Sequence, residues 1–96
     1  MPTYLIVNRA PSGYQGSPEA MQAWNAWFDQ LGEQLVERGN PVFSRTSLGE
    51  CVPGTALGGY TLIQADSLQE ATTLAKSCPI LTEGGGVEIG ELTPLT

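Results

Sequence analysis

The sequence contains no histidine, and only four of its 96 residues are basic. Without histidine the chain cannot form Ser–His or Cys–His nucleophile pairs, or a histidine proton shuttle. Any catalysis would have to use carboxylates, cysteine, lysine, tyrosine or a borrowed metal. The basic residues are scattered along the chain, and ten acidic residues bring the net charge to −6. Nucleic acids and anionic membrane surfaces are bound by cationic patches, so neither partner is expected.

The chain also lacks long apolar runs and has only two cysteines. No segment has the length of a transmembrane helix, and the N-terminal MPTYLIVNRAP lacks the layout of a signal peptide. We therefore expect a cytoplasmic protein in which Cys51 and Cys78 are free thiols. Two cysteines without histidine do not form the usual zinc site, and neither a metal nor a cofactor is expected. The length predicts a single domain, residues 1–96.

Turn residues and apolar periodicity divide the chain into four strands and two helices. Ser17 and Pro18 are typical of a helix start, and Ser67 with Glu70 forms a capping box before a second helix. The order is β-α-β-β-α-β, which predicts a ferredoxin-like α+β fold. Its four-stranded antiparallel sheet has both helices on one face, and the first and third strands are central. The strands are expected at 3–9, 42–52, 60–65 and 87–92, and the helices at 18–38 and 68–78.

The two central strands carry apolar side chains on both faces, as YLIV and YTLI show. Helices cover only one of these faces. Leaving each large aliphatic side chain of the other face in water forfeits roughly 1.5–3 kcal/mol, so four of them forfeit about 6–12 kcal/mol. A second copy of the chain, packed sheet against sheet about a two-fold axis, is the expected cover. The alternative is a monomer with a tolerated apolar patch.

Short motifs along the chain resemble those of the YCII-related domain family, in particular its DGPF-like branch. The matching residues are the N-terminal strand YLI, the tryptophan-containing first helix, Leu57-Gly58-Gly59-Tyr60, Asp66, Ser67, Cys78-Pro79, Gly84-Gly85-Gly86 and Val87-Glu88. The resemblance implies a dimeric α+β barrel. Some relatives, dehydrochlorinase-like lyases among them, have a His–Asp pair proposed to be catalytic. This chain has no histidine, and it also lacks the DGPF motif.

Several residues that suggest chemistry have simpler structural interpretations. Cys78 lies at the C-terminus of the expected second helix, where the helix dipole opposes a thiolate, so a buried apolar role is favoured. The three glycines Gly84–Gly86 precede a strand rather than a helix, which indicates a turn and not a phosphate loop. Asp66 is either a base or a solvated acid that steadies the start of the second helix.

Seven residues are predicted to form a ligand-binding cleft between the first helix and the sheet. Arginine would bind a carboxylate and tryptophan would stack on a ring, which suits a small organic anion. In the alternative interpretation both tryptophans belong to the core and Arg45 pairs with a local acid. The candidate residues are Asn8, Arg9, Tyr14, Trp24, Trp27, Arg45 and Asp66.

Three kinds of function remain open at this point. The first is a small dimer that binds an aromatic or carboxylate ligand without catalysis, which we favour. The second is an enzyme of lyase or isomerase type that acts on an aromatic or polyketide-like acid. The third is a protein-interaction or regulatory module.

Overall fold

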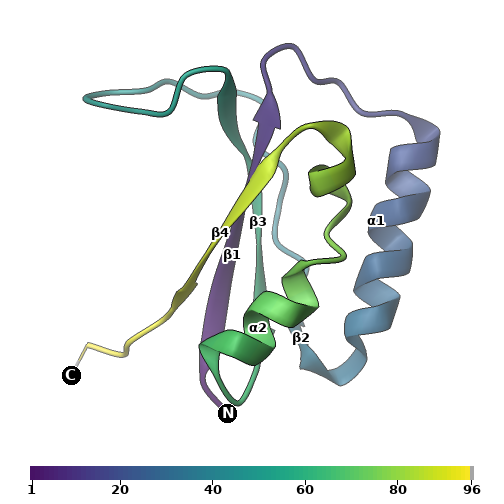
Figure 1. Ribbon diagram of the computed structural model, residues 1–96, viewed down its shortest axis with the longest axis vertical. Coiled ribbons are helices and arrows are strands. Elements are labelled where there is room, and N and C mark those ends of the chain that lie inside the picture. The colour runs from purple at the N-terminus through teal and green to yellow at the C-terminus, as the bar shows by residue number, and fades with distance from the viewer. Residues whose placement is uncertain (96) are drawn as a thin grey trace.

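The part of the chain that the structure describes forms four strands and two α-helices in the predicted order (Figure 1). The computed structural model describes residues 1–95. All neighbouring strands are antiparallel in the order β2-β3-β1-β4, so β1 and β3 are central, as predicted. The ferredoxin-like α+β fold of one chain is therefore confirmed. The elements are β1 (Thr3–Pro11), α1 (Pro18–Leu31), η1 (Gly32–Gln34), β2 (Leu35–Glu37), β3 (Thr55–Gln64), α2 (Leu68–Ala75), η2 (Pro79–Glu83) and β4 (Gly86–Glu91).

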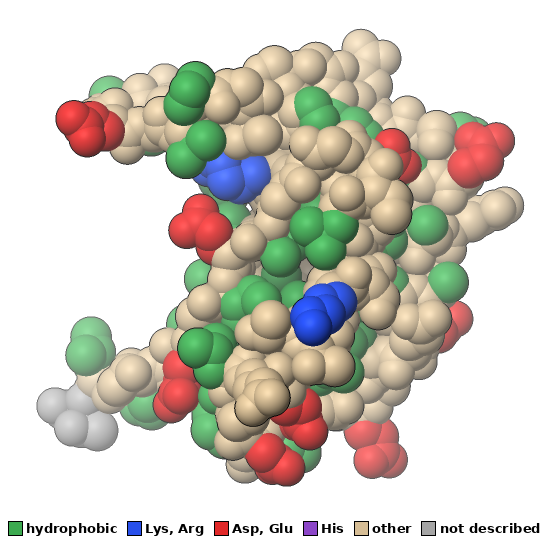
Figure 2. Space-filling model, viewed as in Figure 1, with side chains coloured by type: hydrophobic (Ala, Val, Ile, Leu, Met, Phe, Trp, Pro, Cys, Tyr) green, Lys and Arg blue, Asp and Glu red, His purple; other side chains and the backbone are tan. Residues whose placement is uncertain are grey.

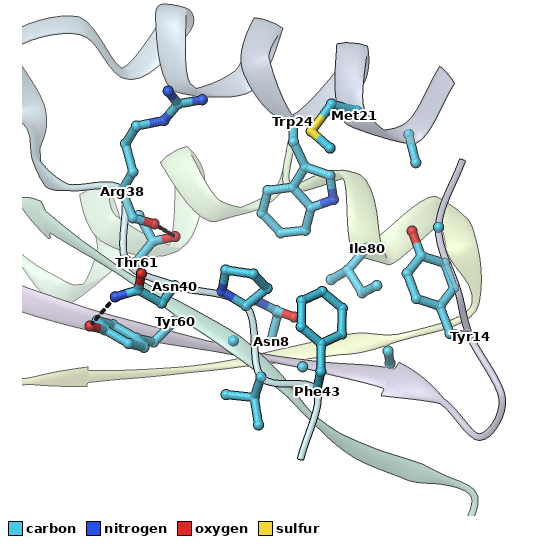
Figure 3. A pocket seen from close by; sticks show the side chains of 18 of the residues that line it. Asn8, Tyr14, Met21, Trp24, Arg38, Asn40, Phe43, Tyr60, Thr61 and Ile80 are labelled. Carbon is cyan, nitrogen blue, oxygen red and sulfur yellow. Dashed lines mark hydrogen bonds between the residues drawn. The ribbon is translucent and has the colours of Figure 1, made fainter. Parts of the chain in front are cut away.

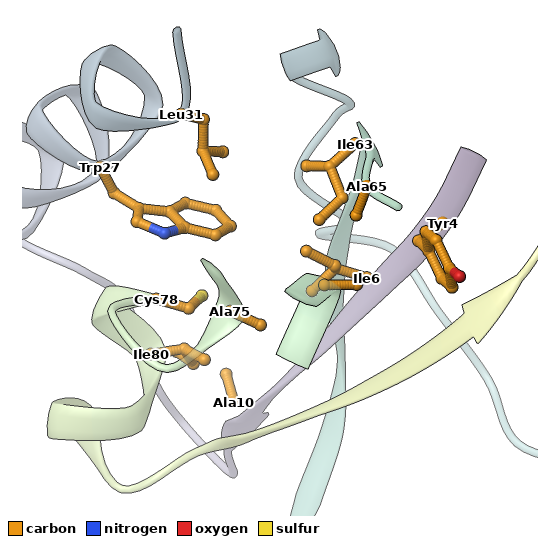
Figure 4. Packing of buried hydrophobic residues seen from close by; sticks show 11 residues of the cluster. Tyr4, Ile6, Ala10, Trp27, Leu31, Ile63, Ala65, Ala75, Cys78 and Ile80 are labelled. Carbon is orange, nitrogen blue, oxygen red and sulfur yellow. The ribbon is translucent and has the colours of Figure 1, made fainter. Parts of the chain in front are cut away.

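Alternation along β1 separates the two faces of the sheet. Its even-numbered residues face the helices and are buried, whereas the odd-numbered residues face the other way and are half-buried. The helix-facing side chains of the sheet join those of both helices in one core (Figure 4). That core contains Tyr4, Ile6, Ala10, Trp27, Leu31, Ile63, Ala65, Ala71, Ala75, Cys78 and Ile80.

Both helices begin where their capping residues predict. The Ser17 hydroxyl accepts a hydrogen bond from the Ala20 N–H at 3.0 Å, and the Ser67 hydroxyl accepts one from the Glu70 N–H at 3.1 Å. The Glu70 carboxylate accepts from the Asp66 N–H at 2.8 Å, one residue before the N-cap residue of α2. Each cap satisfies amides that have no partner within the helix. Asp66 thus takes part in the start of α2 through its backbone.

The first helix is shorter than predicted. It ends at Leu31 instead of Arg38, because Gly32 adopts φ of +54°, a conformation that favours glycine and stops the helix. Leu35 continues the helical spacing of apolar residues, but it pairs with Ile63 of β3 and begins β2. At Leu35, pairing with β3 thus outweighs the helical spacing of the apolar residues.

The prediction of a second strand at residues 42–52 is wrong. The chain between β2 and β3 is an irregular connection that touches the sheet through a Pro41–Gly59 bridge and a 3.0 Å hydrogen bond from the Val42 N–H to the Gly58 carbonyl. The third strand begins at Thr55, five residues before the expected start at Tyr60, so most of the segment between the two predicted strands belongs to β3. Its pairing with β1 shifts after Asn8, where Gly58 is the extra residue of a β-bulge.

The second half of the chain follows the prediction closely. The helix α2 ends at Ala75, a few residues before the expected stop at Pro79, and β4 spans Gly86–Glu91. Gly84 closes η2 in the left-handed conformation at φ +87°, so Gly84 and Gly85 connect η2 to β4, which begins at Gly86. Cys78 is buried, and its burial raises the pKa of the thiol to about 11. Both cysteines are free thiols.

The face of the sheet opposite the helices is open in the single chain. It presents Leu5 and Val7 of β1 and Leu62 of β3, each half-buried. Figure 1 shows the β2–β3 connection and the C-terminal segment reaching outward on the side away from α1. Figure 2 shows a hollow between these two projections. Both projections carry exposed apolar side chains, among them Leu48 and Val52 on the first and Leu92 and Leu95 on the second.

Candidate functional site

A cavity of about 620 Å³ lies on the helical side of the sheet, between α1 and the first residues of the β2–β3 connection (Figure 3). The helix contributes residues from Ala20 to Phe28, and the connection contributes residues from Arg38 to Arg45. The floor consists of Asn8 on β1 and of Gly58 to Thr61 on β3. This volume is in the range that holds a small organic molecule.

Aromatic rings form much of the cavity wall. Trp24 and Phe28 of α1 are half-buried, and their ring centroids are 5.9 Å apart. Phe43 lines the cavity from the β2–β3 connection and is 84% exposed in the single chain. In Figure 3 the Trp24 ring extends from α1 toward the sheet, and the Phe43 ring lies beneath it on the side of the sheet. Rings so placed suit a flat apolar ligand.

Two of the four basic residues of the chain line this cavity. The Arg38 guanidinium lies 4.5 Å from the centroid of the Phe28 ring and also donates a hydrogen bond to the Asn25 side chain. Arg45 donates to the Val42 carbonyl at 3.0 Å. Within residues 1–95, no aspartate or glutamate lines the cavity. A chain of net charge −6 thus has a cavity whose ionised lining side chains are both cationic.

Hydrogen bonds attach the Arg38–Asn40 segment to β3. The Thr61 hydroxyl donates to the Arg38 carbonyl at 3.2 Å, and the Asn40 amide donates to the Tyr60 hydroxyl at 3.1 Å (Figure 3). Gly39 lies so close to β3 that a Cβ atom there would stand 1.7 Å from the Tyr60 carbonyl oxygen. These contacts fix the cavity wall that carries Arg38.

Tyr14 lines the cavity from the loop between β1 and α1. Partial burial raises the pKa of its phenol, and the nearby Glu83 carboxylate raises that pKa further. The phenol is therefore neutral near pH 7 and acts as a hydrogen-bond donor or acceptor. It is unsuited to the role of a base at that pH.

The structure brings four of the seven predicted residues to the cavity. Asn8, Tyr14, Trp24 and Arg45 all line it, although they come from β1, the next loop, α1 and the β2–β3 connection. The expected position of the cleft, between the first helix and the sheet, agrees with this arrangement. The role of these four residues in ligand binding stays a prediction.

The other three predicted residues lie elsewhere. Trp27 is a core residue, 2% exposed, whose indole N–H donates to the Leu74 carbonyl at 3.1 Å. Arg9 points to the opposite face from Asn8 because neighbouring residues of a strand alternate, and it donates to the Thr55 hydroxyl and carbonyl at 3.0 Å each. Asp66 follows the far end of β3, beside the N-terminus of the chain.

Sequence reasoning missed the Arg38–Phe43 segment. The prediction placed Arg38 in the last turn of a long helix and Phe43 in a strand, so neither was assigned to the cleft. A signal was present in Gly39 and Pro41, which indicate a sharp change of chain direction directly after Arg38. Tyr60 was likewise treated only as part of a strand.

Comparison with known proteins identifies a shared fold. No protein-family model and no curated protein matches the chain. A solved structure of 5-chloro-2-hydroxyhydroquinone dehydrochlorinase from Burkholderia phenoliruptrix AC1100, in complex with 2,5-dihydroxybenzoquinone, matches with a TM-score of 0.68. The match covers 95% of this chain and 93% of the enzyme at 16% identity. The chain therefore has the same fold as that dehydrochlorinase.

Proposed function

We propose that the chain binds a small, planar organic anion in the cavity beside α1 without transforming it. The observation that carries the proposal is the charge of the lining. Arg38 and Arg45 both line the cavity, and the carboxylates of this acidic chain lie outside it among the described residues. Arginine recognises planar oxyanions well because its guanidinium is flat and always charged.

The aromatic wall restricts the ligand further. Trp24, Phe28 and Phe43 provide flat apolar surfaces, so a ring gains contact area that a compact inorganic anion does not. The dehydrochlorinase of the same fold was solved with 2,5-dihydroxybenzoquinone, a single ring with acidic hydroxyls. A ligand of that size and charge agrees with the 620 Å³ cavity and its two arginines.

Binding is favoured over catalysis because of the ionisable groups that line the cavity. Among the described lining residues these are two tyrosines and two arginines, and the phenol of Tyr14 has a raised pKa. Proton abstraction near neutral pH is usually carried out by a histidine or a carboxylate, and neither lines the cavity among the described residues. Membership of the YCII-related family is part of this proposal, but a relative's His–Asp chemistry is not.

Isothermal titration with benzoate, with its uncharged counterpart benzamide and with 2,5-dihydroxybenzoquinone tests the proposal. Benzoate should bind at least tenfold more tightly than benzamide, and added salt should weaken its binding. Arg45→Met should reduce benzoate affinity at least fivefold. The control Lys76→Met removes the same charge from the exposed end of α2 and should change it less than twofold. Equal binding of benzoate and benzamide would refute the proposal.

We also propose that two chains associate through the open face of the sheet. Leu5, Val7 and Leu62 lie on that face, between two projections that carry exposed apolar side chains. Leu48 is 89% exposed and Leu95 is 98% exposed in the single chain. Covering such side chains contributes roughly 1.5–3 kcal/mol each when burial is complete.

Sedimentation at micromolar concentration tests the association. The wild type should sediment with twice the 10.2 kDa mass of one chain. Leu62→Glu should give single chains, because it places a charge at the centre of the proposed interface. The control Leu68→Glu changes an exposed leucine on α2 and should leave the mass unchanged. A wild type of 10.2 kDa would contradict the proposal.

A further inference from the structure

Asn8 is a polar residue in an apolar position. It lies in the middle of central strand β1, on the face that packs against the helices, between Ile6 and Ala10. Its side chain is 9% exposed, and it lines the cavity beside α1. Within residues 1–95 no hydrogen bond involves this side chain. Its two polar atoms remain accessible, and the residue lines the cavity. A buried amide without a protein partner is unfavourable unless another molecule completes it.

Two glycines of the neighbouring strand β3 leave space for the Asn8 amide. Gly58 and Gly59 lie beside it, and the β-bulge of β3 occurs where Asn8 pairs with Gly59. A Cβ atom at Gly58 would stand 2.5 Å from the Asn8 Oδ1 atom, and one at Gly59 would stand 3.3 Å from Nδ2. The two glycines therefore leave room for the whole amide group. An aliphatic side chain at position 8 would fill the same space and would need no hydrogen-bond partner.

Two further polar groups reach the same cavity. The Trp24 indole N–H and the Tyr14 hydroxyl belong to lining residues, and neither makes a hydrogen bond within the described part of the chain. Figure 3 shows the Tyr14 ring beside Ile80, with its hydroxyl pointing toward α1. The floor and one side of the cavity thus offer hydrogen bonds that the protein leaves unused.

We infer that the Asn8 amide is the polar recognition group of this cavity and that it hydrogen-bonds a carbonyl or hydroxyl oxygen on the ring of the bound anion. The inference rests on the proposed function and narrows it to oxygenated rings, such as hydroxy-substituted aromatic acids and hydroxyquinones. An amide both donates and accepts, so it pairs with either kind of oxygen. A ring without such an oxygen leaves the buried amide unpaired, and sites of this kind discriminate strongly against the missing group.

Titration of benzoate and of 2-, 3- and 4-hydroxybenzoate against wild type and Asn8→Leu tests the inference. Leucine has the branched shape of asparagine without its polar atoms. The best hydroxybenzoate should bind wild type at least tenfold more tightly than benzoate, which is 1.4 kcal/mol. In Asn8→Leu this preference should fall below threefold, because the hydroxyl loses its partner and benzoate no longer leaves an amide unpaired.

Failure of the inference is distinct from failure of the proposed function. If benzoate binds but no hydroxybenzoate is preferred, or if the preference survives in Asn8→Leu, the inference is wrong and the anion site remains. If neither benzoate nor any hydroxybenzoate binds wild type, the proposed function and the inference both fail. Comparing two ligands with two proteins forms a double-mutant cycle. The cycle separates the contact between the ligand oxygen and residue 8 from indirect effects of the substitution.

Thermal unfolding without ligand separates recognition from a structural role. If Asn8 serves the ligand, Asn8→Leu should have a melting temperature equal to or above that of wild type, because an unpartnered buried amide is removed. A clear decrease would indicate that the amide supports the fold and would overturn the inference. Gly58→Ala should displace the amide and abolish the hydroxybenzoate preference. Gly90→Ala, where a Cβ atom meets nothing within 4 Å, is the matched control and should retain it.

Discussion

The two tryptophans of α1 are expected to have separate roles, although they are three residues apart and their ring centroids are only 5.6 Å apart. Trp27 is buried in the core, and its indole N–H donates to the Leu74 carbonyl at 3.1 Å. Trp24 is half-buried, lines the cavity and makes no hydrogen bond within residues 1–95. Phenylalanine at each position keeps an aromatic ring and removes the N–H group.

Trp27→Phe should destabilise the protein by about 2–4 kcal/mol. The substitution leaves the Leu74 carbonyl unpaired in the last turn of α2, which costs about 1–3 kcal/mol. The smaller ring also leaves a void in the core, which costs about 1 kcal/mol more. Trp24→Phe should change stability by less than about 1 kcal/mol, since its ring is partly in water and no protein acceptor loses its donor.

Urea unfolding at a fixed protein concentration measures both effects. With an m-value of about 1 kcal/mol per molar urea, Trp27→Phe should lower the midpoint by roughly 2 M or more. Benzoate titration should show the reverse order: Trp24→Phe weakens binding, and Trp27→Phe leaves it within twofold of wild type. If Trp27→Phe unfolds within about 0.5 kcal/mol of wild type, or if the two variants destabilise equally, the assignment of Trp27 to the core is wrong.

Three further predictions concern the cap of α2 and the two cysteines. Ser67→Ala should lower the free energy of unfolding by about 1 kcal/mol because it removes the cap on the Glu70 N–H, whereas Ser77→Ala at an exposed position should have no measurable effect in the same urea experiment. A thiol reagent at pH 8 should label Cys51 alone in the native protein and both cysteines in urea. The raised pKa of Cys78 contributes stability that is complete below pH 9 and is lost as the pH rises toward 11. The free energy of unfolding of Cys78→Ala should therefore decline less steeply with pH over that range than that of the wild type. Equal slopes of the two free energies against pH would contradict the prediction.

Much of the fold could be predicted because local and long-range preferences agree. The caps at Ser17 and Ser67, the apolar strands at the centre and the turn before Val87 each specify a single structure. The order of these elements then leaves few topologies for the sheet. The same local signals predict that Cys78 is buried and that the chain turns at Gly84 and Gly85 before β4.

The second strand could not be predicted because Leu35 satisfies two patterns at once. Its spacing from Leu31 continues the apolar stripe of a helix, yet in the fold it pairs with Ile63 at the edge of the sheet. The deciding feature is the conformation of Gly32, and a glycine within a helical pattern does not by itself mark an end. A predicted helix that runs to Arg38 covers the true position of β2, so the second strand is predicted too late, at Val42–Val52.

Because the first helix is predicted to run to Arg38, the part of the candidate site that lies in the Arg38–Phe43 segment is missed. Arg38 and Phe43 line the cavity because the chain turns at Gly39 and returns toward α1. Trp24 and Trp27 were not distinguished because a helical stripe does not show which of its members borders a cavity. Asn8 was identified, but the glycine bulge that accommodates its amide becomes visible only in the pairing of β1 with β3.

A crystal structure of the protein grown with 2,5-dihydroxybenzoquinone tests the central claim most directly. The account predicts one ring in the cavity between Trp24 and Phe43, with one of its oxygens within hydrogen-bond distance of the Asn8 amide and another near Arg38 or Arg45. A ring bound only on the open face of the sheet would contradict it, as would a cavity that holds nothing but water at saturating ligand.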